Sequence, residues 1–186
     1  MKNNLTEKDI KTINKWAEKY GIKELKINDK EKIFNLKQLC IFDTNIKHIP
    51  AAIFKLTNLK SFSIYCNNLN RLPKEICNLI NLKKIYIHCE NLKSLPNEIE
   101  KLTNLESIHI ECENLKQLPK EIHNLIKLKR FDIDCPNSEN FPDGIAKLIN
   151  LETIYIINSN GKLNLQYLIG GIVKLNNLKS LYLDIE

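Results

Sequence analysis

The sequence predicts an α/β solenoid: a right-handed, curved stack of short repeats with a parallel β-sheet on its concave side and short helical or 3-10 segments on its convex side. Chemically matched residues recur every 23 positions. Apolar and polar side chains alternate early in each block, which is the period of a strand with one buried face. Later in the block, apolar residues stand three apart, as on a short helix. One block cannot bury its own apolar face, so the blocks must stack.

The repeat is marked by four residue types that each keep a fixed position in the block. Leucine opens the block, cysteine stands at position 8, asparagine at position 10 and proline at position 15. The members are Leu36, Leu59, Leu82, Leu105, Leu128 and Leu151; Cys66, Cys89, Cys112 and Cys135; Asn45, Asn68, Asn91, Asn114, Asn137 and Asn160; and Pro50, Pro73, Pro96, Pro119 and Pro142.

Composition excludes several classes of protein. The chain has 186 residues, of which 43% are hydrophobic and 27% charged, as in a folded domain and unlike a disordered one. Its net charge of +6 is accounted for by solubility, and its lysines lack interleaved aromatic residues, so we expect no nucleic-acid partner. Apolar runs are too short to cross a membrane, and no secretory signal opens the chain. Cysteines without such a signal predict free thiols and a cytoplasmic protein.

Residues 1–35 are predicted to cap the first repeat. Thr6 and Asp9 resemble a capping box at the start of a helix, and Gly21 supplies its stop. A shortened repeat follows, with apolar residues at block positions 1, 4 and 6: Ile22, Leu25 and Ile27. Such a helix covers the exposed apolar end that every solenoid has.

Residues 36–177 are predicted to form six repeats, with bounds 36–58, 59–81, 82–104, 105–127, 128–150 and 151–177. Position 8 shares a strand face with positions 4 and 6, so the cysteines are expected to point inward and extend the core. A row of thiols for redox or metal chemistry is the alternative, but zinc and iron clusters need a closed set of ligands rather than a line. The asparagines at position 10 are expected to bond the backbone of the turn.

Residues 178–186 are predicted to form a last half-repeat strand. Its inward side chains, Leu181, Leu183 and Ile185, have no following repeat to cover them. Two arrangements remain open: the long block from Leu151 folds its extra residues across this edge, or the edge docks on another copy. The glycine-containing insertion favours the first, and hence a monomer or at most a weak dimer.

The repeat resembles the leucine-rich repeat family, in particular its 23-residue class with an L-P-x-x-I-x-x-L second half, as in LKKIYIHCENLKSLPNEIEKLTN at residues 82–104. The resemblance implies a non-catalytic module that binds a protein or peptide on its concave face. Similar repeats act as host-directed effectors in bacteria and as signalling scaffolds in eukaryotes. The sequence implies no cofactor or metal.

The outward positions 5, 7 and 9 of each strand gather acidic and aromatic residues in a chain that is net basic. Open-sheet tyrosines are typical of interfaces, and the acids predict a partner with basic or hydrogen-bonding groups. The predicted partner-binding residues are Phe42, Tyr65, Tyr86, His88, Glu90, His109, Glu111, Glu113, Asp132, Asp134, Tyr155 and Tyr182.

Two other functions remain open. The first is self-assembly of a structural protein through the C-terminal edge. The second is a metal-dependent hydrolase built on His88, His109 and Glu111, which lie on adjacent strands about 5 Å apart. We disfavour the hydrolase because a parallel sheet surface offers no cavity, and because the sequence lacks the usual nucleophile and metalloprotease motifs.

Overall fold

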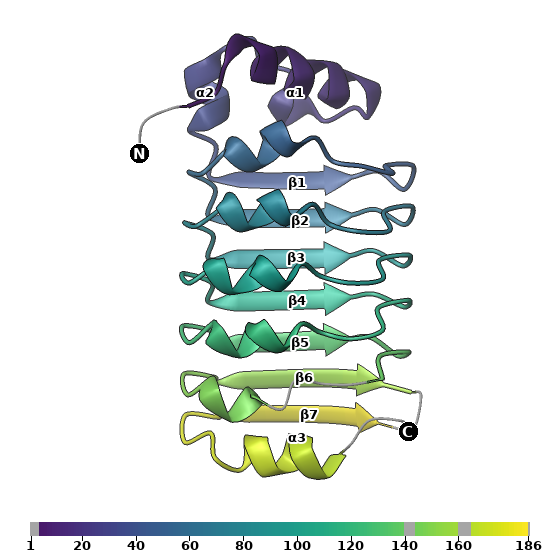
Figure 1. Ribbon diagram of the computed structural model, residues 1–186, viewed down its shortest axis with the longest axis vertical. Helices are drawn as coiled ribbons and strands as arrows, with labels where there is room; N and C mark the ends of the chain where they lie inside the picture. The colour runs from purple at the N-terminus through teal and green to yellow at the C-terminus, as the bar shows by residue number, and fades with distance from the viewer. Residues whose placement is uncertain (1–3, 140–143, 160–164, 186) are drawn as a thin grey trace.

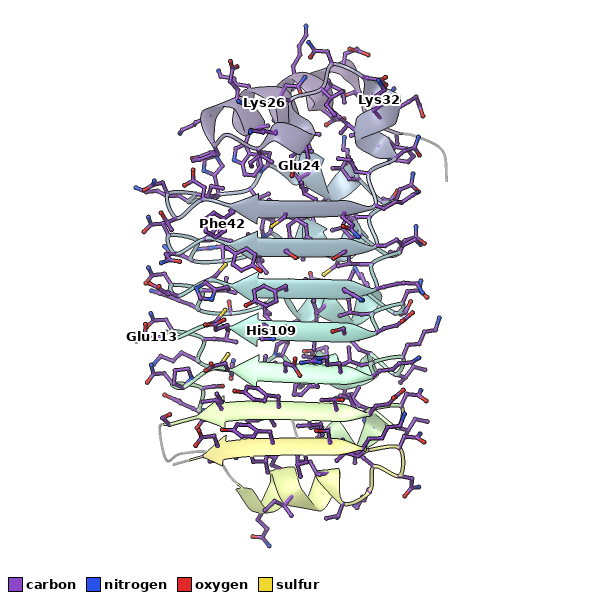
Figure 2. The ribbon with its side chains drawn as sticks, turned by 180° about the vertical axis from the view of Figure 1, so that it is seen from behind. Glu24, Lys26, Lys32, Phe42, His109 and Glu113 are labelled. Atoms are coloured by element: carbon purple, nitrogen blue, oxygen red, sulfur yellow. The ribbon has the colours of Figure 1, made fainter. Side chains whose placement is uncertain are left out.

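A computed structural model describes residues 4–139, 144–159 and 165–185 and shows the predicted α/β solenoid (Figure 1). Seven parallel strands form one sheet in chain order, with short helices along one side and a helical cap at the N-terminal end. We call the surface of this sheet that the short helices leave uncovered the sheet face (Figure 2). The strands are β1 (Gln38–Phe42), β2 (Ser61–Tyr65), β3 (Lys84–His88), β4 (Ser107–Glu111), β5 (Arg130–Asp134), β6 (Thr153–Asn158) and β7 (Ser180–Ile185).

The strand register follows the sequence repeat. Gln38 pairs with Ser61 and Ser61 with Lys84, a step of 23 residues that continues to β6. The last step is 27 residues, from Thr153 to Ser180, because the sixth block is longer. Equivalent side chains therefore stand beside one another and form columns across the sheet.

Most return segments are 3-10 helices, as the apolar spacing predicts. Pro50, Pro73, Pro96 and Pro119 each stand one residue before a 3-10 helix, at the N-cap, with nearly the same extended backbone: Pro73 has φ −60° and ψ 140°. Pro142 lies outside the described residues. The 3-10 helices of the repeats are η2 (Ala51–Lys55), η3 (Lys74–Asn78), η4 (Asn97–Lys101), η5 (Lys120–Asn124) and η6 (Ile145–Lys147).

The core is a set of apolar columns between the sheet and the short helices. The inward strand positions carry isoleucine, leucine or phenylalanine. The side chains of Ile41, Ile64 and Ile87, for example, are fully buried. The predicted inward cysteines are confirmed, since Cys66, Cys89, Cys112 and Cys135 are at most 1% exposed. Asn158 ends this column: its buried amide donates to the carbonyls of Cys135 and Ser138, which a thiol could not satisfy.

Two ladders of asparagine side chains tie successive turns together. The ladder at position 10 is confirmed: Asn68 donates to the Thr44 carbonyl and Asn91 to that of Asn67. Asn160 lies outside the described residues. A second ladder, at position 23, was not predicted, although the same 23-residue recurrence marks it. Its donors and carbonyl acceptors are Asn58 to Phe34, Asn81 to Thr57, Asn104 to Ile80 and Asn150 to Ile126. Asn177, the last residue of the longer sixth block, donates in the same way to Ile149.

The N-terminal cap begins with helix α1 (Glu7–Lys19), whose predicted capping box is present: the Thr6 hydroxyl accepts from the Asp9 N–H, and the Asp9 carboxylate accepts from the Thr6 N–H. Gly21 has φ 70° and ends this segment. The following residues form a 3-10 turn, η1 (Lys23–Leu25), and a short helix, α2 (Lys30–Phe34), rather than a further strand.

Helix α1 closes the apolar end of the stack, as expected. It packs against η2, and the Trp16 indole N–H donates to the His48 carbonyl at 3.2 Å. The Lys55 ammonium lies 2.8 Å from the Asp9 carboxylate, so the capping residue also joins the cap to the first repeat.

The C-terminal end is covered less completely. The long sixth block forms helix α3 (Leu165–Ile172) in place of a 3-10 helix, and α3 packs against η6 (Figure 1). Gly161 lies outside the described residues. Leu183 and Ile185 are partly buried against the core, but Leu181 stays 46% exposed. Helix α3 thus lies at the C-terminal end of the stack (Figure 1), where Leu181 leaves an apolar rim.

Candidate functional site

The sheet face carries two rows of side chains that run across all seven strands. The row at position 5 contains Tyr86 and His109, and the row at position 7 contains Tyr65, His88 and Glu111. Figure 2 looks onto this face, with Phe42 on β1 and His109 on β4, while Glu113 lies beyond the end of β4. The predicted site residues from these two rows therefore share one surface.

An aromatic run covers the N-terminal half of the sheet face. The rings of Phe42 and Tyr65 have centroids 5.5 Å apart, those of Tyr65 and Tyr86 4.9 Å, and those of Tyr86 and His109 4.2 Å with nearly parallel planes. Each ring comes from a different strand, so sheet pairing holds the run in place. Phe42 is 74% exposed although it is fully apolar, which makes it the open end of the run.

Glu111 joins two of these strands by hydrogen bonds. Its carboxylate lies 2.9 Å from the His88 Nδ1 and accepts from the Tyr86 hydroxyl at 3.2 Å. Burial alone would raise the pKa of Glu111, but the His88 and Tyr86 bonds outweigh it and the pKa lies below its ordinary value. Burial and the same carboxylate raise the pKa of Tyr86 to about 12.

Asp132 sits in a second network. Its Oδ2 accepts from the Arg130 Nε at 2.5 Å and lies 3.5 Å from the His109 Nδ1. Burial acts to raise the pKa of Asp132, but the bonds to His109 and Arg130 hold it below its ordinary value. The His109 Nε2 is 4.0 Å from Glu111, so the two networks adjoin.

Asp132 corrects one expectation. It was expected to be exposed on the sheet, but it is only 2% exposed, because it is enclosed between His109 and Tyr155 on the neighbouring strands and beneath Arg130. This carboxylate is held by the protein's own cation rather than offered to a partner.

Asp134 behaves differently although it is two residues away on the same strand. It is partly exposed and lies beside Glu111 in the register. Burial and the charge of Glu111 raise its pKa. A carboxylate in this position is stabilised by any added positive charge.

The remaining predicted residues lie around this centre. Glu90 and Glu113 are exposed beyond the strand ends, and the Asn67 amide donates to Glu90 at 2.7 Å. Tyr155 and Tyr182 stack at 4.7 Å on the far side of Asp132, so they form a second aromatic pair rather than part of the first run. The alternation of the sequence predicted that all of these residues lie on one side of the sheet. It did not predict that the aromatic residues form two separate groups.

The three side chains of the hydrolase alternative do meet, but within the described ranges no group of three or more His, Cys, Asp and Glu side chains could hold a metal ion. Nor does this part of the chain contain a helix long and apolar enough to cross a membrane.

Comparisons with known proteins agree with the geometry. A family model described as a leucine-rich repeat region matches residues 74–186. No curated protein matches the chain. Similar solved structures include a leucine-rich repeat protein of Leptospira interrogans, with 21% identity over 82% of this chain and 55% of the other and a TM-score of 0.41. This chain therefore spans about half the length of that protein.

Two further solved structures are similar. The leucine-rich repeat domain of the type III effector XopL shares 20% identity over 82% of this chain and 70% of its own, with a TM-score of 0.46. A chain of the Toll–Spätzle complex of Drosophila shares 17% identity over 83% of this chain and 24% of its own, with a TM-score of 0.58, and so has the same fold. With most of its length matched by the family model, this chain belongs to the leucine-rich repeat family.

Proposed function

We propose that the protein binds a protein or peptide partner through the sheet face, and that the partner presents basic side chains there. Leucine-rich repeat proteins are generally protein-binding modules and typically not enzymes. The observation that supports this face is its composition: a chain of net charge +6 has gathered aromatic rings and carboxylates on one surface. Aromatic residues supply contact area at low entropic cost, and acidic groups select for a cationic partner.

The parts of the surface have distinct roles in this proposal. Phe42, Tyr65 and Tyr86 form the larger contact area, and the Tyr155–Tyr182 pair forms the second. Asp134, for which no ion pair is seen among the described residues, lies between them. An arginine or lysine of the partner would restore the charge balance of Asp134 while its apolar stem packs on the rings.

A displayed library of random peptides tests the proposal without knowledge of the partner. The wild type is expected to select peptides enriched in Arg and Lys, and Glu111→Lys/Asp134→Lys is expected to lose them. The matched control Glu75→Lys/Glu98→Lys makes the same charge change on η3 and η4, on the opposite side of the sheet, and should keep the selection. Equal loss in both variants, or after reversing Lys74 and Lys120, would place the binding surface elsewhere.

Assembly through the C-terminal end is the second candidate function. Ile169, Val173 and Leu181 are 48%, 73% and 46% exposed at this end, and β7 pairs only with β6 in the described sheet. A free strand edge beside apolar side chains is a template for a second copy. Sizing by light scattering at several concentrations tests this: a mass that stays at one chain up to high concentration excludes it.

We also propose that the protein acts in the cytoplasm. All six cysteines are free, and five of them are buried in the core. A reducing compartment suits such a chain.

A further inference from the structure

The sheet face holds two of the four histidines of the chain within its carboxylate cluster. His88 on β3 contacts Glu111 on β4, and its ring lies 6.0 Å from that of Tyr65 on β2. His109 on β4 lies between Tyr86 on β3 and Asp132 on β5. Both imidazoles are about 30% exposed, so protons reach them from solvent.

The charge balance of this centre depends on those two rings. With neutral imidazoles, the carboxylates of Glu111, Asp132 and Asp134 face one guanidinium, that of Arg130, which leaves a net charge of −2. Histidine ordinarily takes up a proton near pH 6.5. Two imidazolium groups would bring the same centre to zero charge, with Glu90 and Glu113 left at its rim.

We infer that His88 and His109 compete, when protonated, with the partner's cations for Glu111 and Asp134, so that the sheet face binds a basic partner at neutral pH and releases it on mild acidification. This inference rests on the proposed function. His88 and His109 already lie 2.9 and 4.0 Å from the Glu111 carboxylate, and Asp134 is the register neighbour of Glu111, so protonation needs no rearrangement to act. Tyr86 does not compete for protons in this range, because burial and Glu111 raise its pKa to about 12.

Release follows from electrostatics alone. A bound arginine beside Asp134 would face two additional positive charges at distances of one or two strand spacings, on a partly exposed surface where such repulsion is only partly screened. Aromatic contacts would persist, so acidification should weaken binding without abolishing it.

The test uses a fluorescein-labelled peptide of six arginines separated by glycines, with affinity measured by anisotropy at constant ionic strength. The protein's own net positive charge opposes nonspecific binding of this probe. Between pH 8.0 and pH 5.5 the wild type should lose about tenfold in affinity, while His88→Gln/His109→Gln should lose less than about threefold. Glutamine keeps a donor toward each carboxylate. The control His48→Gln/His123→Gln should behave like the wild type, because those histidines lie outside the sheet face.

The outcomes separate the two proposals. Binding at pH 8.0 that does not weaken by pH 5.5, or that weakens equally in the His88→Gln/His109→Gln variant, would overturn the pH switch and leave the proposed function standing. No binding at any pH would overturn both. Circular dichroism at pH 5.5 accompanies each measurement, and a loss of affinity that coincides with unfolding would also count against the switch.

Discussion

The two faces of the same sheet follow different rules. On the core face the strand columns stay apolar, and the position-6 column is isoleucine from β1 to β6, so that Ile64, Ile87 and Ile110 are equal in size and fully buried. On the sheet face the equivalent columns change from phenylalanine through tyrosine and histidine to carboxylates. Stacking of repeats requires side chains of similar size and polarity at equivalent core positions. Recognition of a partner requires different side chains in a particular order. Substitutions on the core face should therefore change stability, and those on the sheet face should change binding.

The largest expected contrast is in thiol chemistry. The exposed thiol of Cys40 should react first with a small reagent such as iodoacetamide, while Cys66, Cys89, Cys112 and Cys135 should react at least about a thousandfold more slowly, because their exposure requires opening of the core. Burial, reinforced by neighbouring thiols, raises the pKa of Cys66 and of Cys89 to about 12, which slows them further. Mass spectrometry of native protein over time measures this, and rapid labelling of the buried column would contradict it.

The next contrast compares two phenylalanines. Phe131→Ala removes a side chain that is 1% exposed and should lower the free energy of unfolding by about 3–5 kcal/mol. Phe42→Ala removes one that is 74% exposed and should change it by less than about 0.5 kcal/mol, although it weakens partner binding. Chemical denaturation followed by circular dichroism gives both values. A similar loss in the two variants would mean that the sheet face also holds the fold together.

A smaller effect is expected at the C-terminal rim. Leu181→Lys/Leu183→Lys should lower the free energy of unfolding of the monomer by about 1–3 kcal/mol, since Leu183 packs against the core and Leu181 is only 46% exposed. Unchanged stability together with loss of a dimer would instead identify this end as an assembly surface.

A contrast of similar size lies within the sheet face itself. At pH 7, Asp132→Asn should lower the free energy of unfolding by about 1–3 kcal/mol, because it weakens charged hydrogen bonds to a buried oxygen. Asp134→Asn should leave it unchanged within about 0.5 kcal/mol or raise it, because burial and the neighbouring Glu111 charge disfavour the charged form of Asp134 and raise its pKa. Denaturant titrations of the two variants and the wild type decide this.

The pH dependence has opposite signs for these two aspartates. The folded-state pKa of Asp132 is lowered, so its stabilising effect is present above its unfolded pKa and is lost as the pH falls through the folded value. The folded-state pKa of Asp134 is raised, so its destabilising effect disappears as the pH falls. The difference in the free energy of unfolding between Asp132→Asn and Asp134→Asn should therefore narrow below about pH 4. A gap that stays constant down to pH 3 would contradict these assignments.

The repeat made the architecture predictable because the same sequence pattern, and hence the same backbone structure, recurs in successive blocks. The strands, the short helices, the inward cysteines and the position-10 asparagines all follow from residues that recur 23 apart. The helix α3 was not foreseen, since its block departs from the pattern that carries the prediction.

The sheet face was predictable in membership but not in detail. A period of two tells which side of the sheet a residue occupies, and it placed Asp132 and Asp134 together. It cannot tell that Arg130 and His109 close over one of them while the other stays open, because this depends on side chains from three strands. Whether a polar side chain is buried depends on the side chains around it, whereas the side of the sheet on which it lies depends only on its position in the strand.

Site-specific crosslinking tests the central claim most directly. A photoreactive benzoylphenylalanine is placed at Tyr65 or Tyr155 on the sheet face, or at Ile126 or Ile149, which are 55% and 60% exposed in the turns that lead into β5 and β6. Peptides selected by the wild type should crosslink from Tyr65 and Tyr155 and not from the two isoleucine positions. Crosslinks from Ile126 or Ile149, with none from the tyrosine positions, would show that the partner binds away from the sheet face.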